Sequence, residues 1–107
     1  MLISSKVCGL LGLARRAGKI SFGTEACRKD IESNRVKLVI IAEDAAERTK
    51  MNFKNICSKK DIPIFEILNI EEISTAIGQQ NKAVVGIKDL NFSKEIIKII
   101  NGGEAIG

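Results

Sequence analysis

The hydrophobic positions of the chain follow two different periods. Near the start, Val7, Leu10, Leu11 and Ala14 recur at three- and four-residue intervals, which places them on one face of an amphipathic helix. Residues 38–42 instead form a continuous apolar run rich in β-branched side chains, which is typical of a strand covered on both faces. The pattern therefore predicts an α/β protein.

Helix and strand patterns alternate along the whole chain. The expected strands are residues 19–22, 38–42, 64–67 and 83–87, and the expected helices after the first are residues 24–34, 45–60, 69–78 and 90–100. Such alternation is typical of helices packed on both faces of one sheet. We expect a three-layer α/β/α sandwich with a largely parallel or mixed central sheet of about four strands. It would be one domain of residues 1–100, followed by a disordered tail at residues 101–107.

Several residues indicate where helices begin or end. Ser4 or Ser5 can cap the first helix, and Gly18 can end it. Asn69 and Glu72 have the spacing of a capping box at the start of the fourth helix. The sequence therefore predicts sharp boundaries for these two helices.

The acidic pair Glu43-Asp44 directly follows the buried strand and permits two interpretations. Ligands of α/β proteins bind beyond the carboxyl ends of such strands, which makes the pair a candidate site. Acids at this point also commonly start the next helix, here from residue 45, and we favour this second interpretation.

Residues 23–29, Gly-Thr-Glu-Ala-Cys-Arg-Lys, have the properties of an anion-binding helix start. Gly23 permits a tight turn after the preceding strand, and Thr24 can cap the helix that follows. The first amide groups of a helix have no partner inside it, and together with the helix dipole and Lys29 they attract phosphate. The alternative is an ordinary capped surface helix whose dipole is complemented by Glu25.

The charge of the 107-residue chain is unevenly distributed. Residues 1–60 contain 13 Lys and Arg against 6 Asp and Glu, whereas residues 61–107 contain 4 against 7. A basic half is the usual electrostatic footprint of a protein that binds a polyanion, although many solvated surfaces carry a similar excess. The charge distribution therefore favours a nucleic-acid partner without proving one.

The cysteines offer little chemistry. The chain has three of them, with no C-x-x-C spacing and no histidine, so a zinc site and Cys–His catalysis are not expected. Ser/His/Asp sets and Gly-rich nucleotide-binding motifs are also missing, and we expect no enzyme activity and no cofactor. Reduced thiols, together with the lack of a signal-peptide pattern or long apolar span, indicate a cytoplasmic protein away from membranes.

Two common modes of RNA binding do not fit the chain. The segment Gly-Leu-Leu-Gly at residues 9–12 resembles the GXXG loop of KH domains, but it lies within a helical pattern and no strand precedes it. The four phenylalanines are the only aromatic residues, and most occupy expected core positions, so base stacking is not expected to dominate. RNA binding would depend on a helix end, charge and shape.

Four segments, in this order, resemble one known family. They are Leu-Gly-Leu-Ala-Arg-Arg-Ala-Gly-Lys at residues 11–19, the glycine at residue 23, Lys-Leu-Val-Ile-Ile-Ala-Glu-Asp at residues 37–44, and Ile-x-x-Ala-Ile-Gly at residues 73–78. On these segments the chain resembles the archaeal and eukaryotic L-seven-Ae ribosomal protein family, and within it the bacterial YlxQ-type branch. The likeness covers about residues 6–100.

The resemblance implies an α/β/α ribosomal-protein-like fold that binds kink-turn RNA, a sharply bent duplex built on tandem sheared G·A pairs. In the family, the tip helix enters the groove at these pairs through a Gly-x-Asn-Glu-x-x-Lys pattern. Gly23 and Lys29 match its glycine and lysine, which implies that Lys29 donates to a guanine O6 while Lys19 and the helix start hold the backbone. Glu25-Ala26 stands where the family has Asn-Glu, so the carboxylate lies one residue early and the amide is absent.

The resemblance also implies that the loop after the third strand, Leu68-Asn69, closes over a flipped nucleotide. The candidate RNA-binding residues are therefore Lys19, Gly23, Thr24, Glu25, Arg28, Lys29, Asp44, Leu68 and Asn69. We expect a monomer that binds kink-turn-like or ribosomal RNA, on the ribosome or during its assembly. The alternative is a protein-interaction module of translation or RNA processing that docks through the Lys-rich third helix or the acidic C-terminal half.

Overall fold

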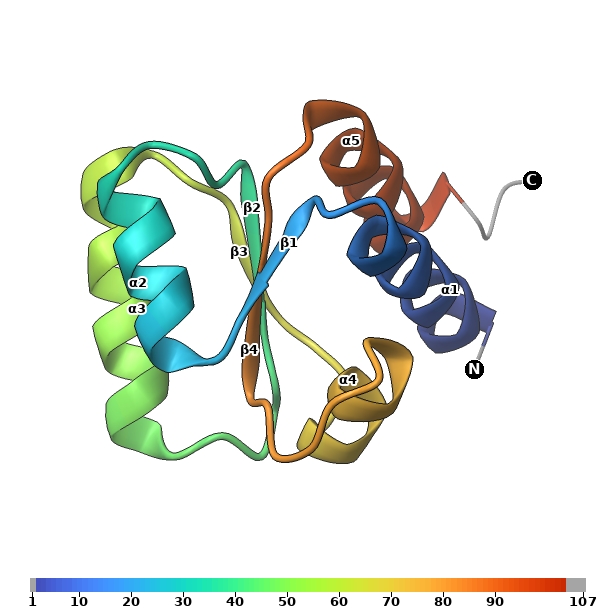
Figure 1. Cartoon of the computed structure of the whole chain (residues 1–107), viewed down its shortest axis with the longest axis horizontal. Coiled ribbons are helices and arrows are strands. Elements are labelled where there is room, and N and C mark those ends of the chain that lie inside the picture. Colours follow the sequence, from blue (N-terminus) through green and yellow to red (C-terminus); the bar gives the residue numbers. More distant parts are fainter. Residues whose placement is uncertain (1, 104–107) are drawn as a thin grey trace.

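The computed structural model describes residues 2–103 and shows helices on both faces of a single four-stranded sheet (Figure 1). The elements, in chain order, are α1 (Leu2–Arg16), β1 (Ile20–Phe22), α2 (Thr24–Glu32), β2 (Leu38–Ile41), α3 (Glu47–Lys60), β3 (Ile64–Glu66), α4 (Ile70–Ala76), β4 (Val84–Ile87), α5 (Leu90–Lys98) and the π-helical turn η1 (Ile99–Gly103). Helices α2 and α3 cover one face of the sheet, and α1, α4 and α5 cover the other. This arrangement confirms the expected three-layer architecture.

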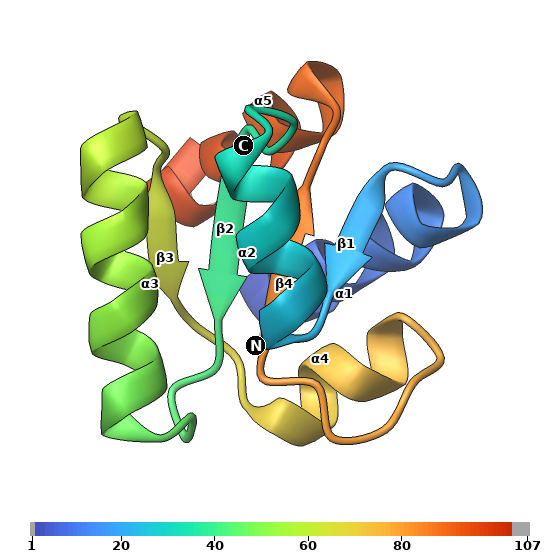
Figure 2. The same ribbon diagram turned by 60° about the vertical axis from the view of Figure 1, so that its left-hand side comes forward.

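The sheet is mixed because β4 runs against the direction of the other three strands. The strand order is β1-β4-β2-β3, in which β4 pairs antiparallel with β1 and β2, and β2 pairs parallel with β3. Strands β1, β2 and β3 therefore end at one edge of the sheet, where α2, α3 and α4 begin (Figure 2). The starts of three helices are gathered at this edge, which we call the helix-start edge.

The two central strands, β2 and β4, form the middle of the hydrophobic core. All four residues of each strand are buried. A strand covered by helices on both faces has no polar side, which explains the continuous apolar run in the sequence. Phe53 of α3 packs against the sheet from one face. Leu11 of α1, Ile73 of α4 and Ile96 of α5 pack from the opposite face.

Helix α1 begins earlier than predicted. Its first residue is Leu2, so neither Ser4 nor Ser5 caps it, and that part of the prediction is wrong. A cap residue lies outside the first helical turn, whereas both serines lie inside it. Gly18 follows the end of the helix as predicted, with a φ of 72° that favours glycine.

The helical path at the C-terminal end of the described chain is kinked at Gly102, which has a φ of 95° and a ψ of 5°. Helix α5 passes directly into the π-helical turn, which contains residues 101–103, the first part of the expected tail. Residues 104–107, the rest of that expected tail, lie outside the described residues. Among the helices of residues 2–103, none is both long and apolar enough to cross a membrane.

Candidate nucleic-acid interface

Helix α2 starts after a single glycine with an unusual backbone conformation. Gly23 has a φ of 88° and a ψ of 159°, a combination found almost entirely in glycine. Its N–H donates to the carbonyl oxygen of Val84 on β4 at 3.0 Å, which ties the turn to the sheet. No side chain of residues 2–103 caps the helix. The amide groups of its first turn are therefore left open to solvent or a ligand.

Thr24 does not cap α2, so this prediction is wrong. It is the first helical residue, and Gly23 occupies the cap position. A side-chain cap comes from a residue with non-helical backbone, whose oxygen accepts from an N–H two or three residues further on. The Thr24 side chain is exposed instead, and the helix start is more open than the sequence indicated.

The outward face of α2 carries basic side chains without acidic partners. Arg28 and Lys29 are exposed, and neither forms an ion pair within the described part of the chain. They line a surface hollow together with Glu25, Ala26 and Glu32. Lys29 lies in the last turn of α2, on the same outward face as Glu25 of the first turn.

The inner face of α2 is fixed to the sheet. Cys27 and Ile31 are fully buried, and Asp30 accepts a hydrogen bond from Ser21 Oγ of β1 while lying 3.8 Å from Lys88 Nζ. Burial raises the pKa of the Cys27 thiol to about 12, so this thiol stays protonated at neutral pH and packs as a small apolar group. These contacts hold the helix in place and leave its outer face available.

Helix α4 also begins at the helix-start edge, but side chains close its first turn. Asn69 and Glu72 form the predicted capping box, in which Asn69 Oδ1 accepts from the Glu72 N–H at 2.7 Å and Glu72 Oε1 accepts from the Asn69 N–H at 2.9 Å. Asp44 Oδ1 accepts from the Ile70 N–H at 2.9 Å. Asp44 therefore caps α4 and not α3, which begins later, at Glu47. The prediction that Asp44 starts the helix after it is wrong.

Leu68 and Asn69 are not placed as free surface side chains. The Leu68 side chain is buried, with 7% of its surface exposed, and its φ is 65°. The Asn69 side chain is engaged in the capping box. The structure therefore gives both residues a role in the fold, at the turn that leads into α4.

Helix α3 begins at the same edge with no side-chain cap from residues 2–103, and two of its five basic residues, Lys50 and Lys54, are paired with an acid. Glu66 of β3 lies 2.9 Å from Lys50 Nζ and 3.1 Å from Lys54 Nζ. The hydrogen bond from Lys50 holds the pKa of Glu66 below its usual range and raises the pKa of Lys50. Lys50 is buried, so it is not part of an exposed lysine surface on this helix. Within residues 2–103, the first turn of α3 contains the exposed and unpaired Arg48 beside Glu47, whereas α2 carries two unpaired basic residues, Arg28 and Lys29, on its outward face.

Lys19 lies at the opposite edge of the sheet from the open start of α2. It precedes β1 whereas Gly23 follows that strand, and four extended residues span about 13 Å. The Lys19 carbonyl oxygen accepts from the Lys88 N–H at 2.8 Å, and its side chain is exposed. The structure therefore separates Lys19 from the open start of α2.

The sequence analysis missed basic residues beside Gly23. Lys82 Nζ lies 3.9 Å from the position that a Cβ on Gly23 would take and 5.8 Å from the centroid of the Phe22 ring. The guanidinium carbon of Arg15 lies 5.1 Å from the same centroid. Lys82 comes close to Phe22 and Gly23 because β4, which follows it, pairs with β1, and this pairing joins segments that are distant in the sequence.

An apolar hollow lies away from the helix-start edge, between α1 and α5. It is lined by Lys6, Gly9, Leu10, Leu13, Glu95, Lys98 and Ile99. Residues 2–103 contain no group of three or more His, Cys, Asp or Glu side chains that could hold a metal ion. The described surface thus offers a basic helix start and an apolar hollow as its main candidate contact areas.

Comparison with known proteins identifies the family. The model of the Ribosomal protein L7Ae/L30e/S12e/Gadd45 family matches residues 5–97. The chain belongs to this family. The matched region runs from α1 to α5 and includes both the open start of α2 and the capped start of α4, which confirms the resemblance seen in the sequence segments.

Individual relatives agree with this assignment. The chain is 40% identical over 97 residues to the RNA-binding protein YlxQ of Enterococcus faecium, an alignment covering 91% of this chain and 93% of that protein. It is 30% identical to the RNA-binding protein YlxQ of Bacillus subtilis (strain 168), over 86% and 92% of the two chains. The large ribosomal subunit protein eL8 of Thermoplasma volcanium is 31% identical, over 92% and 82%.

Solved structures share the fold. A protein described as having unknown function, from Bacillus halodurans C, superposes with a TM-score of 0.86 and 34% identity, covering 90% of this chain and 97% of that one. The Giardia lamblia 15.5kD RNA binding protein superposes with a TM-score of 0.79 and 20% identity, over 100% and 92%. At 20% identity this second likeness supports the fold alone.

Proposed function

We propose that the chain is an RNA-binding protein that recognises kink-turn RNA, or a similarly bent duplex, with the open start of α2. The observation that carries the proposal is the first turn of α2, which no side chain of residues 2–103 caps, beside the exposed and unpaired Arg28 and Lys29. The names of the two YlxQ relatives support RNA as the ligand class.

The chemistry of the contact follows from these groups. Free amides at a helix start, reinforced by the helix dipole, bind phosphate oxygens. Such contacts fix the position of the duplex, while contacts to base edges supply specificity. Lys29 is the group that donates to a guanine O6, because it is exposed on the outward face of α2 and forms no ion pair with an acid of the described chain.

The proposed contact set contains the residues around the open turn. It consists of Gly23, Thr24, Glu25, Arg28, Lys29 and, added from the structure, Lys82. Lys19 is left out because it lies at the other edge of the sheet. Leu68 is left out because it is buried, and Asp44 and Asn69 because their side chains cap α4.

Glu25 takes over the role of the family's carboxylate in this proposal. It stands in the first turn of α2, four residues before Lys29, so both side chains lie on the same outward face. A carboxylate accepts from the Watson–Crick edge of guanine while the neighbouring ammonium donates to O6. Because Glu25 lies one residue before the family position, we infer that the preferred RNA differs from that of relatives with Asn-Glu.

A ribosomal setting and a monomeric state complete the proposal. The relative named as a large ribosomal subunit protein supports a role on the ribosome or in its assembly. Both faces of the sheet are covered by the chain's own helices, and the edge strands β1 and β3 are only three residues long. Short edge strands disfavour pairing with a second chain.

A gel-shift titration tests the proposal. It compares a kink-turn RNA with the same duplex in which the tandem G·A pairs are replaced by Watson–Crick pairs. We expect markedly tighter binding to the kink-turn RNA. Equal affinity for both duplexes would leave only general charge attraction and would contradict the proposed specificity.

A protein-interaction module is the second candidate function, and the apolar hollow between α1 and α5 favours it. Leu13, on its wall, is 48% exposed, and exposed apolar patches are common at protein interfaces. Salt separates the two candidates. Phosphate contacts release counterions, so the logarithm of RNA affinity falls with the logarithm of salt concentration by about 0.7 to 0.9 per contact. Binding to a protein through apolar contacts need not follow this dependence.

A further inference from the structure

We propose that Arg15 binds a backbone phosphate of the RNA on the α1 side of the open α2 start, a role that rests on the proposed RNA-binding function. Arg15 comes from the last turn of α1, and its guanidinium is held against the ring of Phe22, the last residue of β1 before Gly23. The arrangement extends the interface from α2 across the end of β1.

The position of the Arg15 guanidinium is set by the ring. Its central carbon lies 5.1 Å from the Phe22 centroid, within the range of a cation–π contact. A planar guanidinium stacked on a ring loses much of its conformational freedom, and its N–H groups are then presented in a fixed fork. Phosphate oxygens accept from such a fork in pairs.

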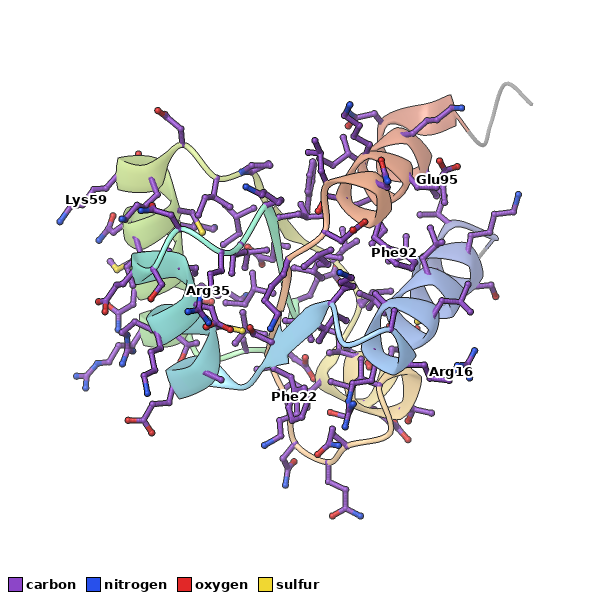
Figure 3. The ribbon with its side chains drawn as sticks, turned by 45° about the horizontal axis from the view of Figure 1, so that its top comes forward. Arg16, Phe22, Arg35, Lys59, Phe92 and Glu95 are labelled. Atoms are coloured by element: carbon purple, nitrogen blue, oxygen red, sulfur yellow. The ribbon has the colours of Figure 1, made fainter. Side chains whose placement is uncertain are left out.

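The hydrogen-bonding capacity of Arg15 is unused. Its Nε atom is buried and has no acceptor, and no ion pair joins Arg15 to an acid of residues 2–103. Because the buried Nε is closed to a ligand, the phosphate would accept from the terminal nitrogens of the guanidinium, which also have no acceptor in residues 2–103. An ordinary last-turn arginine would instead extend into solvent, as the exposed Arg16 does (Figure 3).

A second cation strengthens the attraction for an anion. Lys82 Nζ lies 5.8 Å from the same ring centroid. The Lys82 backbone is fixed by buried Ser74, whose Oγ accepts from the Lys82 N–H at 2.8 Å. The two positive groups lie near one ring and repel each other, and neither forms an ion pair within residues 2–103. A bound phosphate would remove that repulsion.

The test measures RNA affinity as a function of salt for wild-type protein and for Arg15→Ala, Arg15→Lys and Phe22→Leu. The probes are the kink-turn RNA and its Watson–Crick counterpart. Arg15→Ala is expected to weaken binding about tenfold and to reduce the salt slope by about 0.7 to 0.9. Arg15→Lys keeps the charge and therefore the slope, but loses part of the affinity because the fork is gone. Phe22→Leu is expected to leave the salt slope unchanged and to weaken RNA binding less than Arg15→Ala does.

Arg16→Ala is the matched control, since Arg16 is the neighbouring exposed arginine and points away from Phe22 (Figure 3). We expect it to change affinity and slope much less than Arg15→Ala does. Because Arg15→Ala removes an unpaired donor, we also expect its melting temperature to be no lower than that of wild type. A purely structural arginine would give the reverse result on both measurements.

The outcomes separate this inference from the function on which it rests. A phosphate contact reads no base, so the effect of Arg15→Ala is expected on both RNAs, whereas recognition of G·A pairs concerns the kink-turn RNA alone. Equal affinity of the wild-type protein for the two RNAs would overturn the kink-turn proposal. The change in salt slope caused by Arg15→Ala would still test the Arg15 phosphate contact. If Arg15→Ala had the same RNA affinity and salt slope as Arg16→Ala, the inference would be overturned. If Lys29→Ala still bound RNA more weakly in the same experiment, the proposed function would remain intact.

Discussion

Helices α2 and α4 begin at the same edge of the sheet, after strands that run in the same direction. They differ in whether side chains accept hydrogen bonds from the amides of the first turn. In α4, Asp44 and Asn69 accept from the amides of the first turn, and Glu72 returns a hydrogen bond to Asn69. In α2, Gly23 occupies the cap position and no side chain of residues 2–103 reaches the amides. One start is closed by the protein itself and the other is left open.

The difference separates a structural helix start from one suited to a ligand. Relative to a capping side chain, glycine at the cap position costs a helix only about a few tenths of a kcal/mol, so α2 leaves its amides open at little cost in stability. The same helix carries Arg28 and Lys29 without acidic partners in the described chain, whereas Lys50 and Lys54 of α3 are paired with Glu66. Unused amides and unused positive charge occur together in α2, which is the combination that a phosphate backbone requires.

The largest effect is expected from Lys29→Ala. We expect binding to a kink-turn RNA to weaken by roughly 1–3 kcal/mol, because the variant loses the donor to the guanine edge. Fluorescence anisotropy titration measures this change. Lys59→Ala is the matched control, since Lys59 is exposed near the end of α3, far from the helix-start edge (Figure 3). Equal affinities of the two variants would place the contact elsewhere.

Gly23→Ala tests whether the open turn depends on its backbone conformation. A Cβ at Gly23 meets nothing closer than 3.9 Å, so the cost comes from strain at φ 88° and is expected to be roughly 1–3 kcal/mol in the free energy of unfolding. Chemical denaturation measures it, and RNA affinity is expected to fall as the turn shifts. Gly9→Ala, at an open helical position in α1, is the control and should be neutral or stabilising. A fully stable Gly23→Ala would argue against a strained turn.

Asn69→Ala makes the converse change at the closed helix start. Removing the cap of α4 is expected to lower the free energy of unfolding by about 1 kcal/mol and to leave RNA affinity unchanged. Asn52→Ala is the control, because Asn52 is exposed within α3 and caps no helix. If Asn69→Ala weakened RNA binding as much as Lys29→Ala, both helix starts would belong to the interface and the comparison would fail.

The smallest effect is expected from Glu25→Gln. Replacing the carboxylate by a neutral amide is expected to weaken binding to the kink-turn RNA by about 0.5–1 kcal/mol, because a charge-assisted hydrogen bond becomes a neutral one. Affinity for the Watson–Crick duplex should stay the same or rise slightly. A rise in affinity for both RNAs would show that Glu25 only repels phosphate and makes no contact with a base.

Features encoded by neighbouring residues were predictable from the sequence. The order of helices and strands follows from hydrophobic periodicity, and the Asn69–Glu72 capping box follows from a spacing of three residues. The apolar run of β2 correctly indicated a strand covered on both faces. These features depend on short segments, so local patterns contain the necessary information.

Features that depend on contacts between distant segments were not predictable. Asp44 caps a helix that begins 26 residues later, and Lys50 is buried through its ion pair with Glu66 on a later strand. Lys82 reaches Gly23 because β4 inserts between β1 and β2. Single-sequence patterns do not specify strand order, so the basic cluster beside the open turn emerged from the structure alone.

The most direct test of the central claim is amide chemical-shift mapping by NMR during titration with a kink-turn RNA. We predict large shifts for the amides of Thr24, Glu25 and Ala26, which lie in the open first turn of α2. The amides of Ile70 and Glu72, whose acceptors are Asp44 and Asn69, should change little. Large shifts at the start of α4 with an unperturbed start of α2 would contradict the account.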